Sequence, residues 1–277
     1  MQNLDLHCHS SISDGTLTPE QVIARAKANG VDVISLTDHD EVRGIAQARE
    51  AAEQLGIRFV PGVEISITWS GETVHIVGLQ IDEKNSSLLK GLAQTRSGRL
   101  LRGRAIAGKL DTLGIPDAFD GAMKYVTNPS IMSRKHFARF LVESKVCDSI
   151  PQAFDKYLKQ GRPAFVPHRW ANITDAINWI HRAGGVAVVA HPGRYNFSDI
   201  AFSAFLDEFK QLGGTGIEVV TGSHTVDQYK KYAGIANRYG LLASVGSDFH
   251  TPGESHIDIG SMPRLPEGVV PVWHNWF

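Results

Sequence analysis

Short apolar, β-branched runs alternate along this chain with amphipathic stretches of helical period. The runs predict strands at residues 3–6, 32–37, 58–64, 73–79, 186–190, 216–220 and 242–246. The stretches between them predict helices at 19–29, 42–55, 172–183, 203–212 and 225–239. This alternation favours a parallel sheet or barrel with helices around it.

The first predicted helix has clear signals at both ends. Thr18 is an N-cap candidate because its hydroxyl can accept a hydrogen bond from a free backbone N–H, and Pro19 suits the first helical position. Gly30 stands just past the other end, where left-handed backbone is common.

One region interrupts the alternation. Residues 98–167 contain no β-branched run and are rich in arginine and amphipathic patterns. We therefore expect a helical insertion at 98–167, between two strands of a barrel domain made of residues 1–97 and 168–277.

Charge narrows the classes of partner. The 277 residues include 28 Lys and Arg and 29 Asp and Glu, so the formal net charge is −1. Long duplex nucleic acid and anionic membranes are not expected partners, because the chain has no global positive field. An anionic substrate must be bound by a local cluster of cations. The sequence is compatible with a monomer.

The cysteines and the first residues indicate the compartment. Cys8 and Cys147 cannot form a disulfide framework, and Cys8 stands between two histidines. The first residues lack a charged segment followed by an apolar run, and no apolar stretch of about 18 residues follows. We expect a soluble protein of the reducing cytoplasm.

Histidines and carboxylates collect where predicted strands end. Residues two apart on a strand face the same side, so His7 and His9 can address one metal ion. The other candidates are Asp14, Asp38, His39, Asp40, Glu64, His191, Asp248 and His250 near strand ends, and His75 within the fourth strand. Such ligands suit Zn²⁺, Mn²⁺ or Fe²⁺, and carboxylates can bridge neighbouring ions.

Each motif taken alone also has an ordinary structural explanation, such as packing, a turn or a helix cap. Nearly all of them, however, fall at the carboxyl ends of predicted strands, where α/β barrel enzymes build their active sites. A shared metal site is therefore the better interpretation.

These motifs resemble those of the PHP family, named for polymerase and histidinol phosphatase. The segments that carry the resemblance are His7-x-His9 with Asp14-Gly15, Thr37-Asp38-His39-Asp40, Pro61-Gly62-Val63-Glu64, Ala190-His191-Pro192 and Gly246-Ser247-Asp248-x-His250. They occur in order, and none is missing. The resemblance implies an α/β fold, a distorted (β/α)7 TIM-like barrel, with a trinuclear metal centre and phosphoesterase activity.

The resemblance also implies nine metal ligands: His7, His9, Asp14, His39, Glu64, His75, His191, Asp248 and His250. One ion would be bound by His7, His9, Glu64 and Asp248. A second would be bound by Glu64, His75 and His191, and a third by Asp14, His39 and His250. We expect three divalent ions, Mn²⁺ before Zn²⁺ or Fe²⁺. Asp38 and Asp40 would orient His39 or cap the next helix, whereas Glu218 is left open between orienting a ligand and simple burial.

Metal ions explain hydrolysis without a protein nucleophile. They lower the pKa of bound water to about 7, so a metal-bridged hydroxide is available at neutral pH, and they hold the phosphoryl oxygens. The nine ligands are thus the expected catalytic residues. Cys8 should face away from His7 and His9 and serve packing.

Phosphate groups beyond the reacting one need their own cations. Arg194 follows a ligand strand closely. Ser133, Arg134 and Lys135 open a predicted helix in the insertion, whose free N–H groups suit an anion. Asp14 is expected to contact substrate as well as metal. Arg162, His168 and Arg169, where the insertion rejoins the barrel, are further candidates.

Within the family, segments 161–167 and 183–186 resemble the stand-alone nucleotidase branch. This implies removal of the 3′-phosphate from nucleoside 3′,5′-bisphosphates and, in related members, 5′–3′ degradation of short RNA. The partner is then a small phosphorylated nucleotide or a short oligonucleotide. Alternatives are a histidinol-phosphate-type phosphatase, an amidohydrolase of C–N bonds and a non-catalytic metal-binding module. An amidohydrolase commonly uses a strand-end lysine, which no predicted strand has, and a non-catalytic module usually loses ligands.

Overall fold

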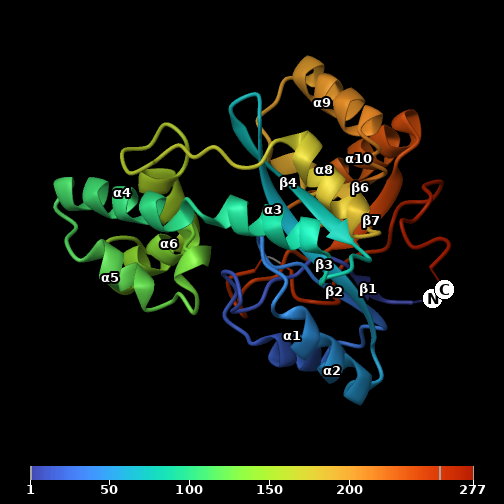
Figure 1. Cartoon of the computed structure of the whole chain (residues 1–277), viewed down its shortest axis with the longest axis horizontal. Coiled ribbons are helices and arrows are strands. Elements are labelled where there is room, and N and C mark those ends of the chain that lie inside the picture. The colour runs from blue at the N-terminus through green and yellow to red at the C-terminus, as the bar shows by residue number, and fades with distance from the viewer. Residues whose placement is uncertain (1, 256, 277) are drawn as a thin grey trace.

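The core of the protein is one seven-stranded sheet with its strands in sequence order. The computed structural model describes residues 2–255 and 257–276. The strands are β1 (Leu4–Asp5), β2 (Val33–Leu36), β3 (Arg58–Trp69), β4 (Glu72–Leu79), β5 (Val186–Val189), β6 (Gly216–Thr221) and β7 (Leu242–Gly246). All seven predicted strands are therefore present, and helices surround the sheet (Figure 1).

The strand β4 runs against its neighbours. Pairings from β1 to β3 and from β5 to β7 are parallel, whereas β4 is antiparallel to both β3 and β5. The parallel arrangement that the alternation favours therefore holds for β1–β3 and β5–β7 but not for β4. The reason is local: β3 ends at Trp69, not at Glu64, and Ser70 and Gly71 both have positive φ. A two-residue turn of this kind joins antiparallel strands.

Backbone contacts between the first and last strands close the barrel. The N–H of Leu6 donates to the carbonyl of Val245 at 3.0 Å, and that of Asp248 donates to the carbonyl of His7 at 2.8 Å. This approach requires Gly246, because a Cβ there would lie 2.3 Å from the Cβ of His7. The closure places the segment after β7 beside the two histidines that follow β1.

Ten α-helices are present among the described residues, with short turns of other helix types. They are α1 (Pro19–Ala28), α2 (Ile45–Leu55), α3 (Ser86–Arg96), α4 (Arg99–Thr112), α5 (Ala118–Met123), α6 (Arg134–Glu143), α7 (Ile150–Ala153), α8 (Ile173–Arg182), α9 (Asp199–Gln211) and α10 (Val226–Tyr239). Turns of 3₁₀ type span Pro129–Ile131 and Pro192–Arg194, and a π-helical turn spans Phe154–Leu158. In the described part of the chain, no helix is long and apolar enough to cross a membrane.

The five predicted barrel helices correspond to α1, α2, α8, α9 and α10. In α1, the predicted cap at Thr18 is confirmed, with Gln21 completing a capping box, and Gly30 has a φ of +72°. The helix α3 was not predicted. Its cap is Asn85, whose side chain accepts from two backbone N–H groups.

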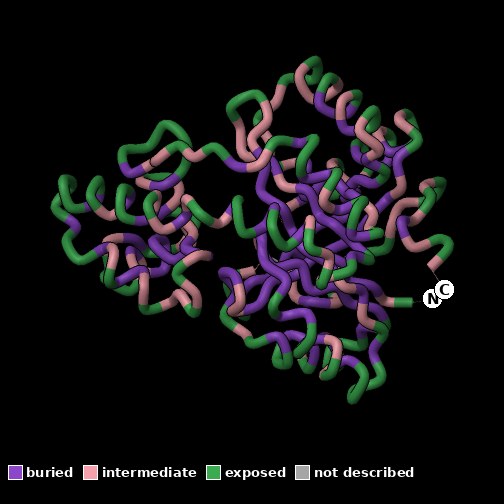
Figure 2. Tube along the Cα trace, viewed as in Figure 1, coloured by how far each residue is buried: buried purple, intermediate pink, exposed green. Residues whose placement is uncertain are grey.

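The insertion has a hydrophobic core of its own. Thirteen buried residues between Ile106 and Ala164 form a cluster separate from the barrel core. Figure 2 shows this second buried region beside the barrel. We propose on this basis that residues 98–167 are an insertion domain and residues 1–97 and 168–277 the barrel domain, whose terminal residues 1 and 277 lie outside the described residues.

Polar contacts join the insertion to the barrel near the mouth of the barrel. Arg139 Nη2 donates to the carbonyl of Asp14 and to Oγ1 of Thr251, both at 2.8 Å. Ser133 Oγ donates to Oδ2 of Asp14 at 3.0 Å. The start of α6 is thereby fixed beside a predicted metal ligand.

Phe137→Ala tests whether the insertion depends on its own core. Phe137 is fully buried in that cluster, so removing its ring should lower the free energy of unfolding by about 3–5 kcal/mol. Chemical denaturation followed by circular dichroism measures the change. Leu101→Ala is the matched control, because Leu101 is 72% exposed on the same domain and its loss should cost under about 0.5 kcal/mol. Equal effects of the two changes would contradict a packed insertion core.

Candidate metal centre and substrate cavity

All nine predicted ligands meet at one end of the barrel. His7 and His9 follow β1, Asp14 lies in the next loop, His39 follows β2, and Glu64 and His75 face each other from β3 and β4. His191 follows β5, and Asp248 and His250 follow β7. His75 reaches the same end from inside its strand because β4 runs in the opposite direction.

The alternation of β1 continues through His7 and His9 as expected. Their Nε2 atoms lie 3.1 Å apart, and both side chains are fully buried. Cys8 between them faces the other way: its Sγ lies 3.2 Å from the carbonyl of Ser35, within a hydrophobic cluster. The predicted packing role of Cys8 is confirmed.

Glu64 lies at the centre of the cluster. Its Oε1 is 2.9 Å from Nδ1 of His75 and 2.9 Å from Nε2 of His191. Its Oε2 is 2.8 Å from Nδ1 of His39. A carboxylate with imidazoles around both oxygens has the geometry of a bridging ligand, which is the role expected for Glu64.

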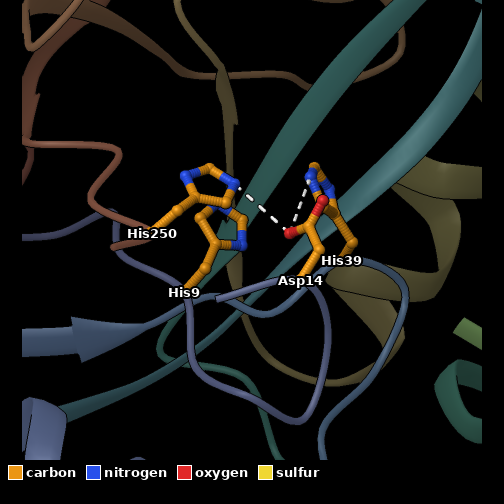
Figure 3. A group of neighbouring side chains, drawn as sticks. All are labelled: His9, Asp14, His39 and His250. Carbon is orange, nitrogen blue, oxygen red and sulfur yellow. Dashed lines mark ion pairs between the residues drawn. The ribbon is translucent and has the colours of Figure 1, made fainter. Parts of the chain in front are cut away.

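Asp14 and Asp248 occupy the two flanks. Figure 3 shows Asp14 between His39 and His250, with Oδ1 3.3 Å from Nε2 of His250. On the other flank, Oδ1 of Asp248 lies 3.2 Å from Nε2 of His9. The expected grouping of Asp14, His39 and His250 is thus brought together, and His9 lies between the two flanks.

Burial and neighbouring charges set the protonation of these groups. Burial alone would raise the pKa of Glu64, but His39, His75 and His7 hold it well below the ordinary value. Burial likewise opposes ionisation of Asp14 and Asp248, yet cationic neighbours hold both pKa values well below normal. The three carboxylates are therefore anionic at neutral pH, as metal binding requires.

The donor set fits divalent metal ions. Four groups of three or four described residues offer donor atoms within 4.8 Å of one another. Two ligands at about 2.1 Å from one ion lie no more than about 4.2 Å apart, so small side-chain adjustments suffice. Nine mixed imidazole and carboxylate ligands are too many for a single ion with four to six ligands.

Two ligand positions have unusual backbone conformations. His191 has a φ of 27° and Asp248 a φ of 53°, in the left-handed region that ordinary residues rarely adopt. Such strain persists only where the surroundings fix it, and it is common at active sites. Gly193 follows His191, and its N–H donates to Nε2 of His224 at 2.9 Å, which holds the turn in place.

Glu218 orients two ligands from β6. Its Oε1 lies 2.6 Å from Nδ1 of His7, and its Oε2 accepts from the backbone N–H of His191 at 2.5 Å. Nδ1 of His7 is thereby engaged, and Nε2 is left to face the cluster. Of the two roles left open for Glu218, these contacts favour orientation of candidate ligands from a buried position.

Asp38 and Asp40 do not take the expected roles of orienting His39 or capping a helix. Asp38 accepts from the N–H and Oγ of Ser10 and from Oγ of Ser13, and so fixes the loop before Asp14. Asp40 accepts from Ser66 and from Arg99 at the start of α4. The next helix, α2, begins after Gly44 with no side-chain cap. Asp38 therefore fixes a loop, and Asp40 joins β3 to α4.

A cavity of about 480 Å³ opens from the candidate metal ligands toward the insertion. The predicted substrate residues Asp14, Ser133, Arg134, Lys135 and Arg194 all line it. Arg162, His168 and Arg169 are not among the lining residues. Arg99, Arg102, Phe154 and Trp170 line it without having been assigned there. Arg99 and Arg102 could have been found from the sequence, because their i, i+3 spacing in the arginine-rich run places them on one face of a helix, α4.

Arg194 also contacts the ligand cluster. One of its guanidinium nitrogens lies 2.5 Å from Oδ2 of Asp248, while about half of the side chain is exposed to the cavity. The carboxylate can thus offer Oδ1 to the cluster and Oδ2 to Arg194. Arg134 is separate from the ligands: it lies over the rings of Phe154 and Phe165 at 5.6 and 5.8 Å.

Comparisons with known proteins all place the chain in the same family. The sequence matches the PHP domain over residues 5–247. A 3′,5′-nucleoside bisphosphate phosphatase from Chromobacterium violaceum is 48% identical over 275 residues, which cover 99% of this chain and 96% of that protein. A 5′-3′ exoribonuclease from Haemophilus influenzae is 42% identical, with 98% of each chain covered.

Solved structures agree with these sequence matches. A protein from Chromobacterium violaceum, described as an amidohydrolase with bound sulfate and no metal, has a TM-score of 0.95 at 48% identity and covers 98% of this chain and 94% of that chain. A protein from Bifidobacterium adolescentis that is classed with metal-dependent phosphoesterases has a TM-score of 0.83 at 29% identity, with 98% and 93% covered.

Glu218→Ala should weaken metal binding while the barrel stays folded. Without the carboxylate, His7 loses the partner that orients it, and losses of this kind typically cost about 10–100-fold in affinity. Titration of metal-free protein with Mn²⁺ measures both affinity and the number of ions, which should exceed one per wild-type chain.

Glu20→Ala, which removes an exposed carboxylate from α1, is the control and should bind Mn²⁺ as wild type does. Unchanged affinity in Glu218→Ala, or at most one ion in wild type, would contradict the arrangement.

Proposed function

The chain belongs to the PHP domain family, and from this membership together with the geometry of the site we propose that it is a metal-dependent phosphoesterase that removes the 3′-phosphate of nucleoside 3′,5′-bisphosphates. The single observation that carries the proposal is the cavity itself. Six of the nine candidate ligands line one end of it, the fully buried His7, His9 and Glu64 complete their cluster, and arginines and a lysine line much of the rest.

The proposed ligands are His7, His9, Asp14, His39, Glu64, His75, His191, Asp248 and His250, with three ions, of which Mn²⁺ is the first choice. When bound, divalent ions supply concentrated positive charge to the phosphoryl oxygens and acidify water near neutral pH. The same nine side chains are therefore the proposed catalytic residues. Asp14, which also accepts from Ser133, lines the cavity and is placed to contact substrate.

The second phosphate needs cations that are not occupied by the reacting group. Arg134 and Lys135 begin α6, whose N-terminus faces the cavity, and Arg194 approaches from the barrel side. We assign Arg134 and Lys135 to the distant phosphate, because Arg194 is held by Asp248 and lies next to the reacting group. This revises the expectation that Arg194, too, binds a phosphate beyond the reacting one.

Short RNA is a second candidate substrate. The relative from Haemophilus influenzae is named a 5′-3′ exoribonuclease, and an Escherichia coli protein of the same name is 40% identical over 274 residues. The first ribose of a 5′-phosphorylated oligonucleotide carries phosphoryl groups at its 5′ and 3′ positions, as in a nucleoside bisphosphate, but the 3′ group is a diester. A small nucleotide or short oligonucleotide is thus the proposed partner, in the cytoplasm, with the chain acting as a monomer.

The amidohydrolase alternative is not favoured. Enzymes of that class commonly carry a metal-bridging lysine at a strand end, and none of the described strands ends in lysine. Lys135, the lysine that lines the cavity, belongs to the insertion. A histidinol-phosphate-type phosphatase would need only one phosphate subsite, so a substrate panel separates it from the proposal.

Phosphate release from adenosine 3′,5′-bisphosphate, with AMP identified as the product, tests the proposed function. The Mn²⁺-loaded protein should prefer this substrate to histidinol phosphate. Asp248→Ala should lower kcat/KM at least about 100-fold, because metal catalysis is worth several kcal/mol. Asp207→Ala, on the exposed face of α9, is the control. A product that retains the 3′-phosphate, or full activity of Asp248→Ala, would contradict the proposed function.

Arg134→Ala should reduce discrimination in favour of the bisphosphate. A charge-assisted hydrogen bond is worth about 1.5–3 kcal/mol, so kcat/KM for adenosine 3′,5′-bisphosphate should fall about tenfold or more. Adenosine 3′-monophosphate, which lacks the second group, should be affected less.

Arg104→Ala is the matched control, because Arg104 also lies over an aromatic ring, Phe119, but outside the cavity. Equal losses on both substrates in Arg134→Ala would show that Arg134 serves the reacting phosphate or the fold.

A further inference from the structure

One wall of the substrate cavity is apolar. Ile150 and Pro151 from α7 and Phe154 from the π-helical turn that follows all line the cavity. The neighbouring Ala153 and Leu158 are buried in the insertion core, and Ile150 and Phe154 pack against that core while part of their surface lines the cavity. The segment therefore turns one apolar face toward its own core and a second apolar face toward a cavity whose other lining residues are mostly polar or charged.

An apolar face on a charged cavity needs an explanation. Apolar surface in contact with water is stabilised when another apolar surface covers it. Phosphate groups and metal ions cannot provide that surface. Helical turns of the π type also occur frequently at functional sites, and this one begins at Phe154.

Phe154 is the side chain in this wall that is best suited to a planar ligand. It is half-buried, so part of its surface is available in the cavity. The guanidinium of Arg134 lies 5.6 Å from its ring centre and is itself held between Phe154 and Phe165. A cation proposed to hold the distant phosphate and an aromatic surface are therefore adjacent, as the phosphate and base of one nucleotide are.

Trp170, the other large aromatic residue of the cavity, is already engaged. It is buried, and Arg99 and Arg102 lie 4.5 and 5.2 Å from its ring centre. Its Nε1 donates to Oγ1 of Thr73. These contacts leave Trp170 as a support for the arginines rather than a surface for a ligand.

We propose that Ile150, Pro151 and Phe154 form a subsite for the nucleobase of the substrate, with the base stacked on the ring of Phe154. This subsite rests on the proposed function and names the residues that recognise the base of its nucleoside substrate. Stacking on an aromatic ring tolerates any base, because every base has a π-face.

The wall recognises the plane of a base rather than its identity. The three side chains carry no hydrogen-bonding group. The adjacent Asp155 also lines the cavity, but its carboxylate pairs with Lys159 at 2.7 Å. The four nucleoside bisphosphates should therefore differ in kcat/KM by less than about fivefold.

The experiment compares adenosine 3′,5′-bisphosphate with the abasic 1,4-anhydroribitol 3,5-bisphosphate, which keeps both phosphates and lacks the base. Both are assayed by phosphate release with the full-length Mn²⁺-loaded protein. Wild type should prefer the nucleoside by about 5- to 150-fold in kcat/KM, the range that stacking of one base supplies. The preference should reside mainly in KM, because the base is remote from the reacting phosphate.

Phe154→Ala should abolish most of this preference by slowing only the nucleoside reaction. Phe154→Leu keeps apolar volume without the ring and should behave similarly, which covers the case where the alanine variant does not fold. Phe154→Tyr, which keeps the ring, should retain the preference. Phe119→Ala is the matched control, because Phe119 is also half-buried beneath an arginine of the insertion but does not line the cavity.

The outcomes separate the two proposals. No phosphate release from either substrate by wild type would overturn the proposed function. Release from both at equal kcat/KM would leave the phosphoesterase intact and overturn the base subsite. Equal losses on both substrates in Phe154→Leu, with melting temperature and metal content unchanged, would also overturn the subsite, because Phe154 would then act through Arg134.

Discussion

The barrel and the site both depend on the burial of one carboxylate. Glu64 is fully buried, and imidazole nitrogens of five histidines lie within 3.4 Å of its oxygens. A buried anion is costly unless groups of opposite charge surround it. The five histidines come from four separate parts of the chain, following β1, β2 and β5 and within β4. Glu64 is therefore stabilised only when the barrel is closed, which couples the fold to the assembly of the metal centre.

Rigid contacts around the cluster hold conformations that the local sequence does not favour. His191 and Asp248 have positive φ, and each is fixed by backbone contacts, to Glu218 in one case and to the carbonyl of His7 in the other. Glu218 spans two ligands and thereby links β1 to β5 through β6. The strain is stored where several strands meet, which is where surrounding structure can best resist it.

The insertion completes a cavity that the barrel alone leaves open. It has its own core, so the start of α6 and the segment from Ile150 to Phe154 are held as parts of a folded unit. Arg139 and Ser133 fix this unit against the loop that carries Asp14. Charge and apolar surface from the insertion thus face the candidate metal ligands from a defined position, and a nucleotide has both kinds of surface.

The sequence by itself determined the seven strands, the ends of α1, the helical nature of 98–167 and the positions of all nine ligand candidates, because period, caps and strand-end chemistry are local properties of the chain. Only the tertiary structure decided that β4 is antiparallel, that Asp38 fixes a loop and Asp40 joins β3 to α4, and that Arg194 contacts Asp248. It also decided that Arg99, Arg102, Phe154 and Trp170 line the cavity. The physical reason is distance along the chain. Each of these features depends on a turn geometry or on a partner from another element, and residue spacing alone does not encode which partner a side chain meets.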